Sequence, residues 1–411
     1  MPGVRLGAPF GTRHLIGTSM DAILTFDLGT SACKVCLWSG GGDLLASAEA
    51  SYPIHHPRPD WAEQDPEDWW RAAVGAGRRV RAAQPAARIG VIGLASQREG
   101  VVPLGRDGRP LSRCIIWMDR RCRPQSARLG EEFGDAFLHR HTGVAPDPNY
   151  TACKLLWLQE HEPDLLRHAA TFLQPRDYLY WRLTGERATD YSLATRTMML
   201  DLRRRCWWPE MFARVGVREA QFPPIYSAIE APYRLAQPAA EALGIPLGIP
   251  VSLGGGDRAC EAVGVGLAGD RASDSTGTAT QVSMVTDRLP DDFGRVPCGL
   301  HALPGRYLFE LGVTTTASAL RWLRELVGLA PEATAALEQE AAQSPPGARN
   351  LIAFPFLMGA RSTRWNPDAR GMILGLSLGH ARGDIARALM EGVAFEVGAC
   401  LDGLRAMGLG P

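Results

Sequence analysis

The sequence has no excess of charge of either sign, because 44 lysines and arginines are matched by 44 aspartates and glutamates. A protein that binds nucleic acid or an anionic membrane surface is expected to carry a basic excess, so we expect neither partner. Long hydrophobic runs are lacking as well: none approaches the roughly 20 residues that a membrane helix needs. The 411 residues exceed what one ordinary hydrophobic core organises, which predicts two or three domains.

Cysteine is also scarce. The nine cysteines are an odd number scattered along a long chain, which is typical of a protein of the reducing cytoplasm. Cys33 and Cys36 form a C-x-x-C pair, but we expect them on a strand, where positions three apart face opposite sides. No second pair lies at zinc-ligand spacing, so these thiols are predicted to serve packing.

Common nucleotide and hydrolase motifs are missing or out of context. The G-x-x-x-x-G-K-[ST] loop is absent, which argues against a Walker-type NTPase. The G-x-G-x-x-G match over 264–269 follows an expected helix rather than a strand, so the dinucleotide interpretation lacks its context. The G-x-S-x-G match over 375–379 has no later strand-borne acid and is predicted to be a loop.

The first twenty residues lack the continuous hydrophobic core of a secretion signal. A better patterned segment opens at Met20. We therefore expect residues 1–20 to be a loose tail or the product of a mis-assigned start.

Hydrophobic periodicity predicts an α/β chain with two similar units. A helix is expected over 66–83, with Asp65 as its N-cap and Pro66 in its first turn. Residues 124–242 are expected to be mainly helical. Strands are expected over 22–28, 34–39, 44–50, 89–95, 101–104 and 249–253, and in the second unit over 298–303 and 307–312 before a helix over 314–327.

Each unit contains two strands joined through a Gly-Thr turn, in "TFDLGTSACKVCLW" and in "ASDSTGTATQVSMV". The similarity predicts two related lobes that face one another across a cleft, with Gly29-Thr30 and Gly277-Thr278 lining it. Such turns present backbone N–H groups and hydroxyls to phosphate oxygens. Either turn alone is better explained as an ordinary hairpin, whereas the two turns together with Asp257 favour a phosphate site. Asp27 is placed to hold Mg²⁺, and Lys34 to add positive charge near the phosphates.

The stretch "SLGGGDRACEAVGVG" sets Asp257 directly after three glycines. Glycines in a row mark a tight turn or a close approach to a ligand. The preceding apolar run predicts a strand, which puts Asp257 at a strand's carboxyl end, where open α/β sheets hold ligands. The alternative is that Asp257 only caps the following helix.

Donors and acceptors gather at another expected strand end, in "ASQREGVV". Gln97, Arg98 and Glu99 offer the mixed hydrogen bonding that a polyhydroxylated substrate needs. Trp117 and Asp119 in "IIWMDRR" are predicted to add an apolar face and a further acceptor. The alternative is an exposed Arg–Glu pair, which stabilises little.

Together these motifs resemble the FGGY carbohydrate kinases. The segments "FDLGTSACKV", "WAEQDPEDWW", "IIWMDRR", "KLLWLQEHEP", "PRDYLYWRLTGERATDYSLATRT", "LGGGDRACEAVGVG" and "DSTGTAT" occur in that family's order, and "ARGMILGLSLGHARGDIARALMEGVAFEV" is similar to its C-terminal signature. The resemblance implies an α/β fold of two actin-like (ribonuclease H-like) lobes around a central cleft. It also implies phosphorylation of a sugar or polyol hydroxyl with ATP and Mg²⁺.

The resemblance further implies roles for single residues. Asp257 matches the family's catalytic base. The other matching positions are the first phosphate segment (Asp27, Gly29, Thr30, Ser31), the second phosphate segment (Gly277, Thr278) and the sugar segment (Gln97, Arg98, Glu99). The expected lobes cover 21–268 and 269–411.

The substrate stays open at this point. The Gln-Arg-Glu order is similar to glycerol kinases, and Arg-Glu-Gly also occurs in autoinducer-2 kinases. "KLLWLQEHEP", "YSLATRT" and "DSTGTA" lean toward xylulokinases and fuculokinases, so a xylulokinase-like enzyme is the leading hypothesis, with fuculose, glycerol or erythritol as alternatives. A catalytically silent sugar-binding or regulatory protein is a second hypothesis. An actin- or chaperone-like ATPase is a third.

Members of the family continue beyond the equivalent of "AMGLGP" into elements that hold adenosine. The sequence therefore predicts an incomplete second lobe with exposed apolar surface, and weak ATP binding with impaired activity. A homodimer is the default expectation for assembly.

Overall fold

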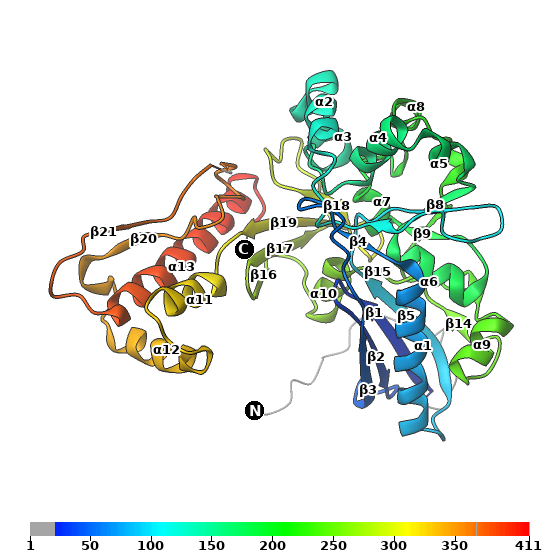
Figure 1. The fold of residues 1–411 in the computed structure, drawn as a ribbon, viewed down its shortest axis with the longest axis horizontal. Coiled ribbons are helices and arrows are strands. Elements are labelled where there is room, and N and C mark those ends of the chain that lie inside the picture. Colours follow the sequence, from blue (N-terminus) through cyan, green and yellow to red (C-terminus); the bar gives the residue numbers. More distant parts are fainter. Residues whose placement is uncertain (1–20, 367, 411) are drawn as a thin grey trace. The chain divides into compact units, whose positions relative to one another are not determined.

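The computed structural model describes residues 21–366 and 368–410, and these form two compact units. The first contains residues 21–132 and 146–260; the second contains 133–145 and the chain from 261 onward (Figure 1). The boundary expected after residue 268 lies a little beyond this division. Residues 133–145 join the second unit, which no sequence pattern indicated. The tail expected over residues 1–20 lies outside the described residues.

A mixed sheet organises the first unit, with strand order β13-β14-β5-β1-β2-β3 and with β15 also pairing with β5. β1, β5, β14 and β15 run parallel, whereas β2, β3 and β13 run antiparallel to their neighbours. The strands are β1 (Ala22–Leu28), β2 (Ala32–Trp38), β3 (Leu44–Ser51), β5 (Ile89–Ser96), β13 (Tyr233–Arg234), β14 (Pro250–Val251) and β15 (Gly255–Gly256).

The expected helix over 66–83 is confirmed as α1 (Pro66–Ala83), which runs along β1, β2 and β3 (Figure 1). It begins where predicted, because the Asp65 carboxylate accepts the Glu67 N–H at 2.9 Å and so caps the first turn. Trp69, Ala76 and Val80 recur at helical spacing and are buried against the sheet. The strand expected over 22–28 is confirmed as β1, in which alternate residues are buried.

Helices and very short strands alternate through the rest of the first unit. The strand expected over 101–104 is confirmed as β6, which pairs with β8. We expected residues 124–242 to be mainly helical, and β8 and the short strand pairs β9–β12 and β10–β11 were missed because two or three residues carry no readable periodicity. The helices are α2 (Arg123–Phe133), α4 (Thr151–His161), α5 (Pro163–His168), α6 (Pro175–Thr184), α7 (Tyr191–Thr195), α8 (Pro209–Val215) and α9 (Gln237–Leu243), with a 3-10 turn at Glu219–Gln221. The strands are β4 (Glu63–Gln64), β6 (Val102–Leu104), β7 (Cys114–Ile115), β8 (Thr171–Leu173), β9 (Thr189–Asp190), β10 (Leu200–Asp201), β11 (Cys206–Trp207) and β12 (Ile225–Tyr226).

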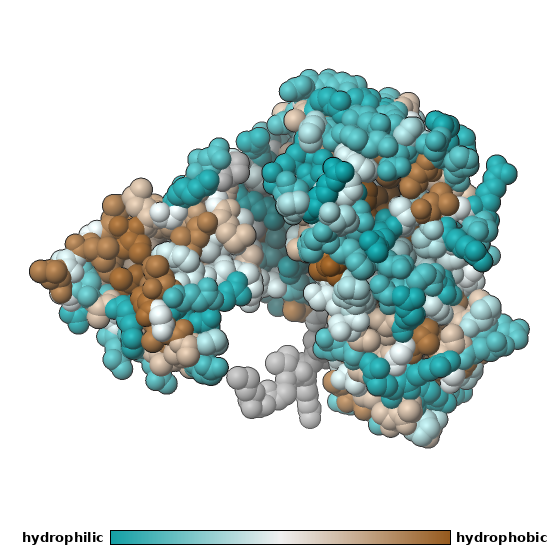
Figure 2. Space-filling view, in the orientation of Figure 1, coloured by the Kyte–Doolittle hydropathy of each residue, from teal (hydrophilic) through white to brown (hydrophobic). Residues whose placement is uncertain are grey.

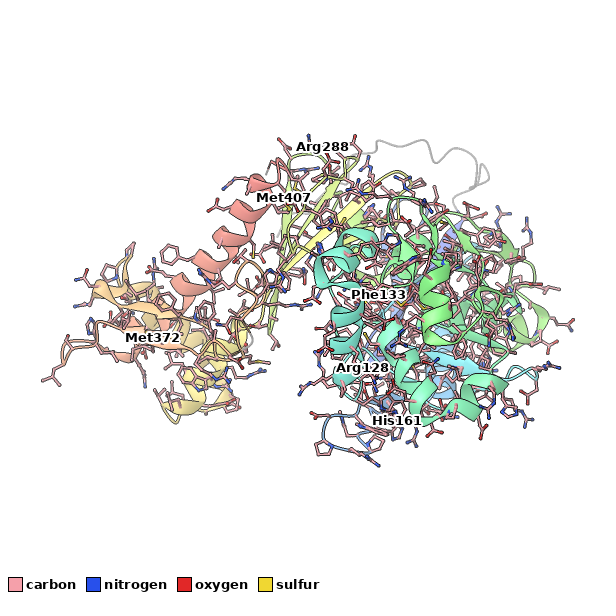
Figure 3. All side chains as sticks on the ribbon, turned by 90° about the horizontal axis from the view of Figure 1, so that it is seen from above. Arg128, Phe133, His161, Arg288, Met372 and Met407 are labelled. Atoms are coloured by element: carbon pink, nitrogen blue, oxygen red, sulfur yellow. The ribbon has the colours of Figure 1, made fainter. Side chains whose placement is uncertain are left out.

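The second unit contains an antiparallel sheet of order β16-β17-β19-β18 and a separate hairpin, β20–β21. The strands are β16 (Ala272–Thr276), β17 (Thr280–Thr286), β18 (Cys298–Leu300), β19 (Tyr307–Val313), β20 (Ile352–Phe354) and β21 (Met372–Leu374). The helices are α3 (Asp135–Thr142), α11 (Ala317–Leu326), α12 (Thr334–Gln343) and α13 (Arg382–Ala406), with 3-10 turns at Pro331–Ala333 and Ala348–Asn350; α10 (Asp257–Gly264) begins in the first unit and ends in the second. Arg288, just beyond β17, lies beside Met407 at the end of α13 and donates to the Gly408 carbonyl at 2.6 Å (Figure 3).

Apolar side chains are exposed on the β20–β21 hairpin. The register pairs Ile352 with Leu374 and Phe354 with Met372, so these four side chains share one face, and each is more than a third exposed. Figure 2 shows apolar surface gathered over this region of the second unit. These four side chains form an exposed apolar face of the hairpin. Within the described ranges, no helix has both the length and the apolar character that crossing a membrane requires.

All nine cysteines are free thiols. Cys33 and Cys36 are both buried on β2, and burial raises the pKa of Cys33 to about 12. The prediction that this pair packs rather than binds metal agrees with these surroundings.

The glycines before Asp257 allow β15 to lie against β5. Gly254 has φ of +65°, and a Cβ atom there would lie 1.7 Å from the Leu94 carbonyl oxygen. At Gly256 a Cβ would lie 2.5 Å from Cδ of Arg98. Two of the three glycines, Gly254 and Gly256, are therefore explained by close packing.

We predict that Gly254→Ala destabilises the first unit by more than about 2 kcal/mol, because both the left-handed backbone and the contact with Leu94 oppose a side chain. Thermal unfolding followed by circular dichroism measures this. Gly264→Ala is the matched control: its Cβ would meet open space at the end of α10, so its melting temperature should equal or slightly exceed that of the wild type. An unchanged melting temperature for Gly254→Ala would show that the contact between Gly254 and the Leu94 carbonyl does not exclude a side chain.

Candidate active site

Three parallel strands deliver polar residues to one edge of the sheet. The register pairs Leu28 of β1 and Gly256 of β15 with the same residue of β5, Ser96. The residues that follow these strand ends therefore emerge together. They are Gly29, Gln97 and Asp257. Asp257 directly follows β15, as expected, and it is the first residue of α10.

The Asp257 carboxylate is held by two donors. Its Oδ1 accepts the Arg258 N–H at 2.7 Å and lies 3.2 Å from Nε of Arg98. Burial raises the pKa of Asp257 above its ordinary value and the nearby Glu99 raises it further, whereas the Arg98 and Arg258 guanidinium groups lower it. Its side chain remains 46% exposed, so the carboxylate is both held and accessible.

Glu99 is buried in a strained conformation. Its φ is +64°, which is uncommon outside glycine. Its backbone N–H donates to Gln174 at 3.1 Å, its carbonyl accepts from the Lys154 ammonium at 2.6 Å, and its carboxylate accepts from Arg196 at 2.6 Å. Burial lowers the pKa of Lys154. The alternative of an exposed Arg–Glu pair is wrong, because Glu99 is 6% exposed and pairs mainly with Arg196 rather than with Arg98, which is 3.9 Å away.

A single buried amide joins Gln97 to the first Gly-Thr turn. The Gln64 side chain donates to the Thr30 carbonyl at 2.6 Å, while its oxygen accepts from the Gln97 amide at 2.8 Å and from Trp69 Nε1 at 3.2 Å. Since Gln64 is fully buried, no water competes for these bonds. Gln64 therefore fixes Gln97 and Thr30 relative to one another.

The first Gly-Thr turn directs its carbonyl groups into the protein. Gly29 O accepts from the Tyr52 hydroxyl, Thr30 O from Gln64, and Ser31 O from the Tyr52 N–H. Because C=O and the following N–H point in opposite directions across a trans peptide, the N–H groups after these three carbonyls face away from that interior. Successive outward N–H groups form a concavity suited to anions.

The second Gly-Thr turn also directs its carbonyl groups toward the interior of its own unit. Gly277 O accepts from the Ala317 N–H at 3.1 Å and the Thr316 hydroxyl at 2.8 Å, and Thr278 O accepts from the Ser318 hydroxyl at 2.7 Å. The donors come from the start of α11. As in the first turn, the following N–H groups point away from these partners.

Asp27 lies on the face of β1 opposite the core, across from Lys34 of β2. Burial raises the pKa of Asp27, Asp257 raises it further, and Lys34 lowers it. Two interacting carboxylates suit a divalent cation that takes its remaining ligands from phosphates and water, as Mg²⁺ does. In 21–366 and 368–410, no cluster of three or more His, Cys, Asp or Glu residues could hold a metal by protein ligands alone.

Trp117 and Asp119 behave differently from one another. Trp117 is 36% exposed, and its Nε1–H donates to the Thr30 hydroxyl at 3.0 Å, which places it next to the first Gly-Thr turn. Asp119 is fully buried and accepts four hydrogen bonds, from Ala62 N, from Arg121 N and from Nε and Nη2 of Arg121. These bonds occupy the acceptor capacity of a carboxylate. The geometry therefore does not support the predicted substrate contact of Asp119, which instead clamps its own loop.

Several residues with clear site contacts were not singled out from the sequence. Gln64, Lys154 and Arg196 each contact a predicted site residue through a buried side chain, and Ser192 contacts Gly256, the residue before Asp257. Each lies within a motif that carries the family resemblance. The motifs were therefore informative, but the individual contacts inside them depend on tertiary structure.

Comparison with known proteins agrees with this arrangement. The model of the FGGY family of carbohydrate kinases, N-terminal domain, matches residues 22–264, and that of the C-terminal domain matches residues 272–408. The xylulose kinase of Escherichia coli (strain K12) is 35% identical over 387 residues, covering 94% of this chain and 79% of the relative. A glycerol kinase of Thermococcus gammatolerans is 29% identical over 384 residues, covering 91% of this chain and 76% of the relative.

A solved structure extends the likeness to three dimensions. The crystal structure of xylulose kinase from Rhodospirillum rubrum superposes with a TM-score of 0.90 at 29% identity, covering 95% of this chain and 80% of that one. Its agreement with the two units supports an actin-like, ribonuclease H-like α/β fold with two domains. The chain belongs to the FGGY family of carbohydrate kinases, and it is a phosphotransferase of that class.

Proposed function

We propose that the protein transfers the γ-phosphoryl group of ATP to a hydroxyl of a small ketose, with xylulose as the first candidate. The observation that carries the proposal is the accessible Asp257 carboxylate, held beside Arg98 at the sheet edge where Gln97 also emerges. The xylulose kinases among the relatives support the ketose. Carbohydrate kinases of this family use ATP with a divalent metal ion, generally Mg²⁺.

In this proposal Asp257 acts as a general base. As the substrate oxygen attacks the γ-phosphorus, the O–H proton passes to the Asp257 carboxylate, a new O–P bond forms, and the bond from the γ-phosphorus to the β-phosphate oxygen breaks to release ADP. Arg98 and the Arg258 N–H hold Oδ1, which orients the carboxylate without removing it from solvent. Asp27 would hold Mg²⁺, which supplies charge neutralisation on the phosphates.

The other predicted site residues have roles that follow from their surroundings. Outward N–H groups of the turns at Gly29-Thr30-Ser31 and at Gly277-Thr278 are proposed to bind phosphate oxygens, with Lys34 adding charge. Gln97, Arg98 and Glu99 are proposed to bind sugar hydroxyls, and the half-open indole of Trp117 to supply an apolar face.

A polyol is the second candidate substrate. The Gln97-Arg98-Glu99 order, which is similar to glycerol kinases, favours glycerol or erythritol, and a glycerol kinase is among the relatives. Fuculose and autoinducer-2-like compounds remain alternatives. The free, mostly buried thiols support a reducing compartment such as the cytoplasm.

The first test is an ADP-release assay with ATP, Mg²⁺ and a panel of xylulose, ribulose, fuculose, glycerol and erythritol. We expect the highest kcat/KM with xylulose. Asp257→Asn should lower kcat by about 10²- to 10⁴-fold, because an amide cannot accept the proton, while calorimetry should show sugar affinity retained.

Asp164→Asn is the matched control, since the Asp164 carboxylate is 75% exposed on α5 and should leave kcat unchanged. Undiminished turnover by Asp257→Asn would overturn the proposed base. Sugar binding without ATP binding or turnover in the wild type would favour the silent sugar-binding protein instead. ATP hydrolysis stimulated by a protein without sugar would favour the ATPase.

The second test uses pH. Only ionised Asp257 accepts a proton, so kcat should fall as the pH drops through the pKa of Asp257. Arg98 lowers that pKa, so Arg98→Met should raise it and move the acid limb of the kcat profile to higher pH.

Arg98→Lys keeps the positive charge and should leave the acid limb near its original position, even if kcat changes. An acid limb in Arg98→Met that coincides with that of the wild type would rule out the electrostatic coupling between Arg98 and the base.

A further inference from the structure

A buried chain of hydrogen bonds ends at the residue before Asp257. The Arg176 guanidinium of α6 donates to Asp190 at 2.8 Å, the Ser192 hydroxyl of α7 donates to Asp190 at 2.6 Å, and the Gly256 N–H donates to the Ser192 hydroxyl at 3.0 Å. Arg176 and Asp190 are fully buried, and Ser192 is 4% exposed. The chain thus links the interior of the first unit to the backbone that carries the carboxylate.

The Gly256 peptide has little freedom to find another partner. It is buried, and its Cα lies so near the Arg98 side chain that a Cβ atom would meet Cδ at 2.5 Å and the Leu193 side chain at 3.5 Å. A buried N–H that loses its acceptor is costly, so the Ser192 hydroxyl determines where this peptide lies. The next residue along the chain is Asp257.

Helix capping accounts for only part of this arrangement. The Asp190 carboxylate caps α7 by accepting the Ser192 N–H at 2.8 Å, which is an ordinary N-cap interaction. The cap does not require the Ser192 hydroxyl to accept a hydrogen bond from Gly256, 64 residues further along the chain. That second bond connects the cap to the loop of the base.

We infer that Ser192 and Asp190 are positioning residues for phosphoryl transfer, which hold the Gly256 peptide so that the Asp257 carboxylate meets the attacking hydroxyl. The inference rests on the proposed role of Asp257. Ser192 accepts from Gly256, Asp190 orients the Ser192 hydroxyl, and Arg176 neutralises Asp190 in the interior. A displacement of about 1 Å at a reacting group is enough to lower a rate by about 10²-fold.

The test begins with Ser192→Ala in the full chain. We expect kcat to fall by about tenfold to a hundredfold at a temperature well below unfolding, with KM for the sugar within about twofold of the wild type. Ser192→Thr retains a hydroxyl and should restore most of kcat. Asp190→Asn keeps an acceptor for the Ser192 N–H but loses the charge that pairs with Arg176, and should give an intermediate kcat. If Ser192→Ala does not fold, the kcat of Asp190→Asn tests the same inference.

Ser344→Ala is the matched control for a merely structural loss. The buried Ser344 hydroxyl donates to Asp384 at 2.6 Å, and the same carboxylate caps α13 by accepting the Ala381 N–H at 2.9 Å. Its loss should lower the melting temperature about as much as Ser192→Ala does, and leave kcat unchanged. If the two variants lose kcat equally, Ser192 has only a structural role and the inference is overturned.

A double variant separates this inference from the proposed function. If Ser192 acts through Asp257, adding Ser192→Ala to Asp257→Asn should cost no further loss of the residual rate, measured by long single-turnover incubation. Full turnover by Asp257→Asn alone would overturn the proposed base. An inactive Asp257→Asn beside a fully active Ser192→Ala would overturn only the positioning role, as would an additive loss in the double variant.

Discussion

The parallel pairing of β1, β5 and β15 is the constraint on which the rest of the site depends. β5 lies between the other two strands, and one of its residues, Ser96, is in register with the ends of both. Three segments distant in sequence therefore reach one edge of the sheet. The approach of β15 to β5 is so close that Gly254 cannot carry a side chain against the Leu94 carbonyl. The close backbone packing of β15 against β5 is therefore what brings Asp257 to this edge of the sheet.

Buried positive charge supports the polar residues at this edge. The Lys154 ammonium holds the backbone of Glu99, the Arg196 guanidinium pairs with its carboxylate, and Arg176 neutralises Asp190 beneath Gly256. Each cation is paired or hydrogen-bonded, as burial requires. These buried ion pairs hold the backbone and side chains at the sheet edge in place, because removing one partner would leave a buried charge without a counter-charge. The strained backbone of Glu99 persists because three separate elements hold it.

Local signals explain what the sequence predicted correctly. β1 and α1 were found from alternation, helical spacing and the Asp65-Pro66 start, and the two Gly-Thr turns were recognised from their repeated pattern. The remaining site contacts are long-range: Gln64 reaches Thr30 across 34 residues, Lys154 reaches Glu99 across 55, and Arg196 reaches Glu99 across 97. No local pattern encodes such pairings. Asp119 was assigned to the substrate because sequence alone does not reveal that its carboxylate is buried and saturated.

The four hydrogen bonds accepted by Asp119 hold the loop that carries Trp117. The loop that carries Trp117 is anchored by Asp119 and by the Arg121 guanidinium, which stacks 3.6 Å from the Trp61 ring, and none of these anchors involves residues 97–99. Replacement of Arg98 therefore leaves these anchors of the Trp117 loop in place. The loop that carries Trp117 and the Arg98 side chain can therefore change in sequence independently of one another.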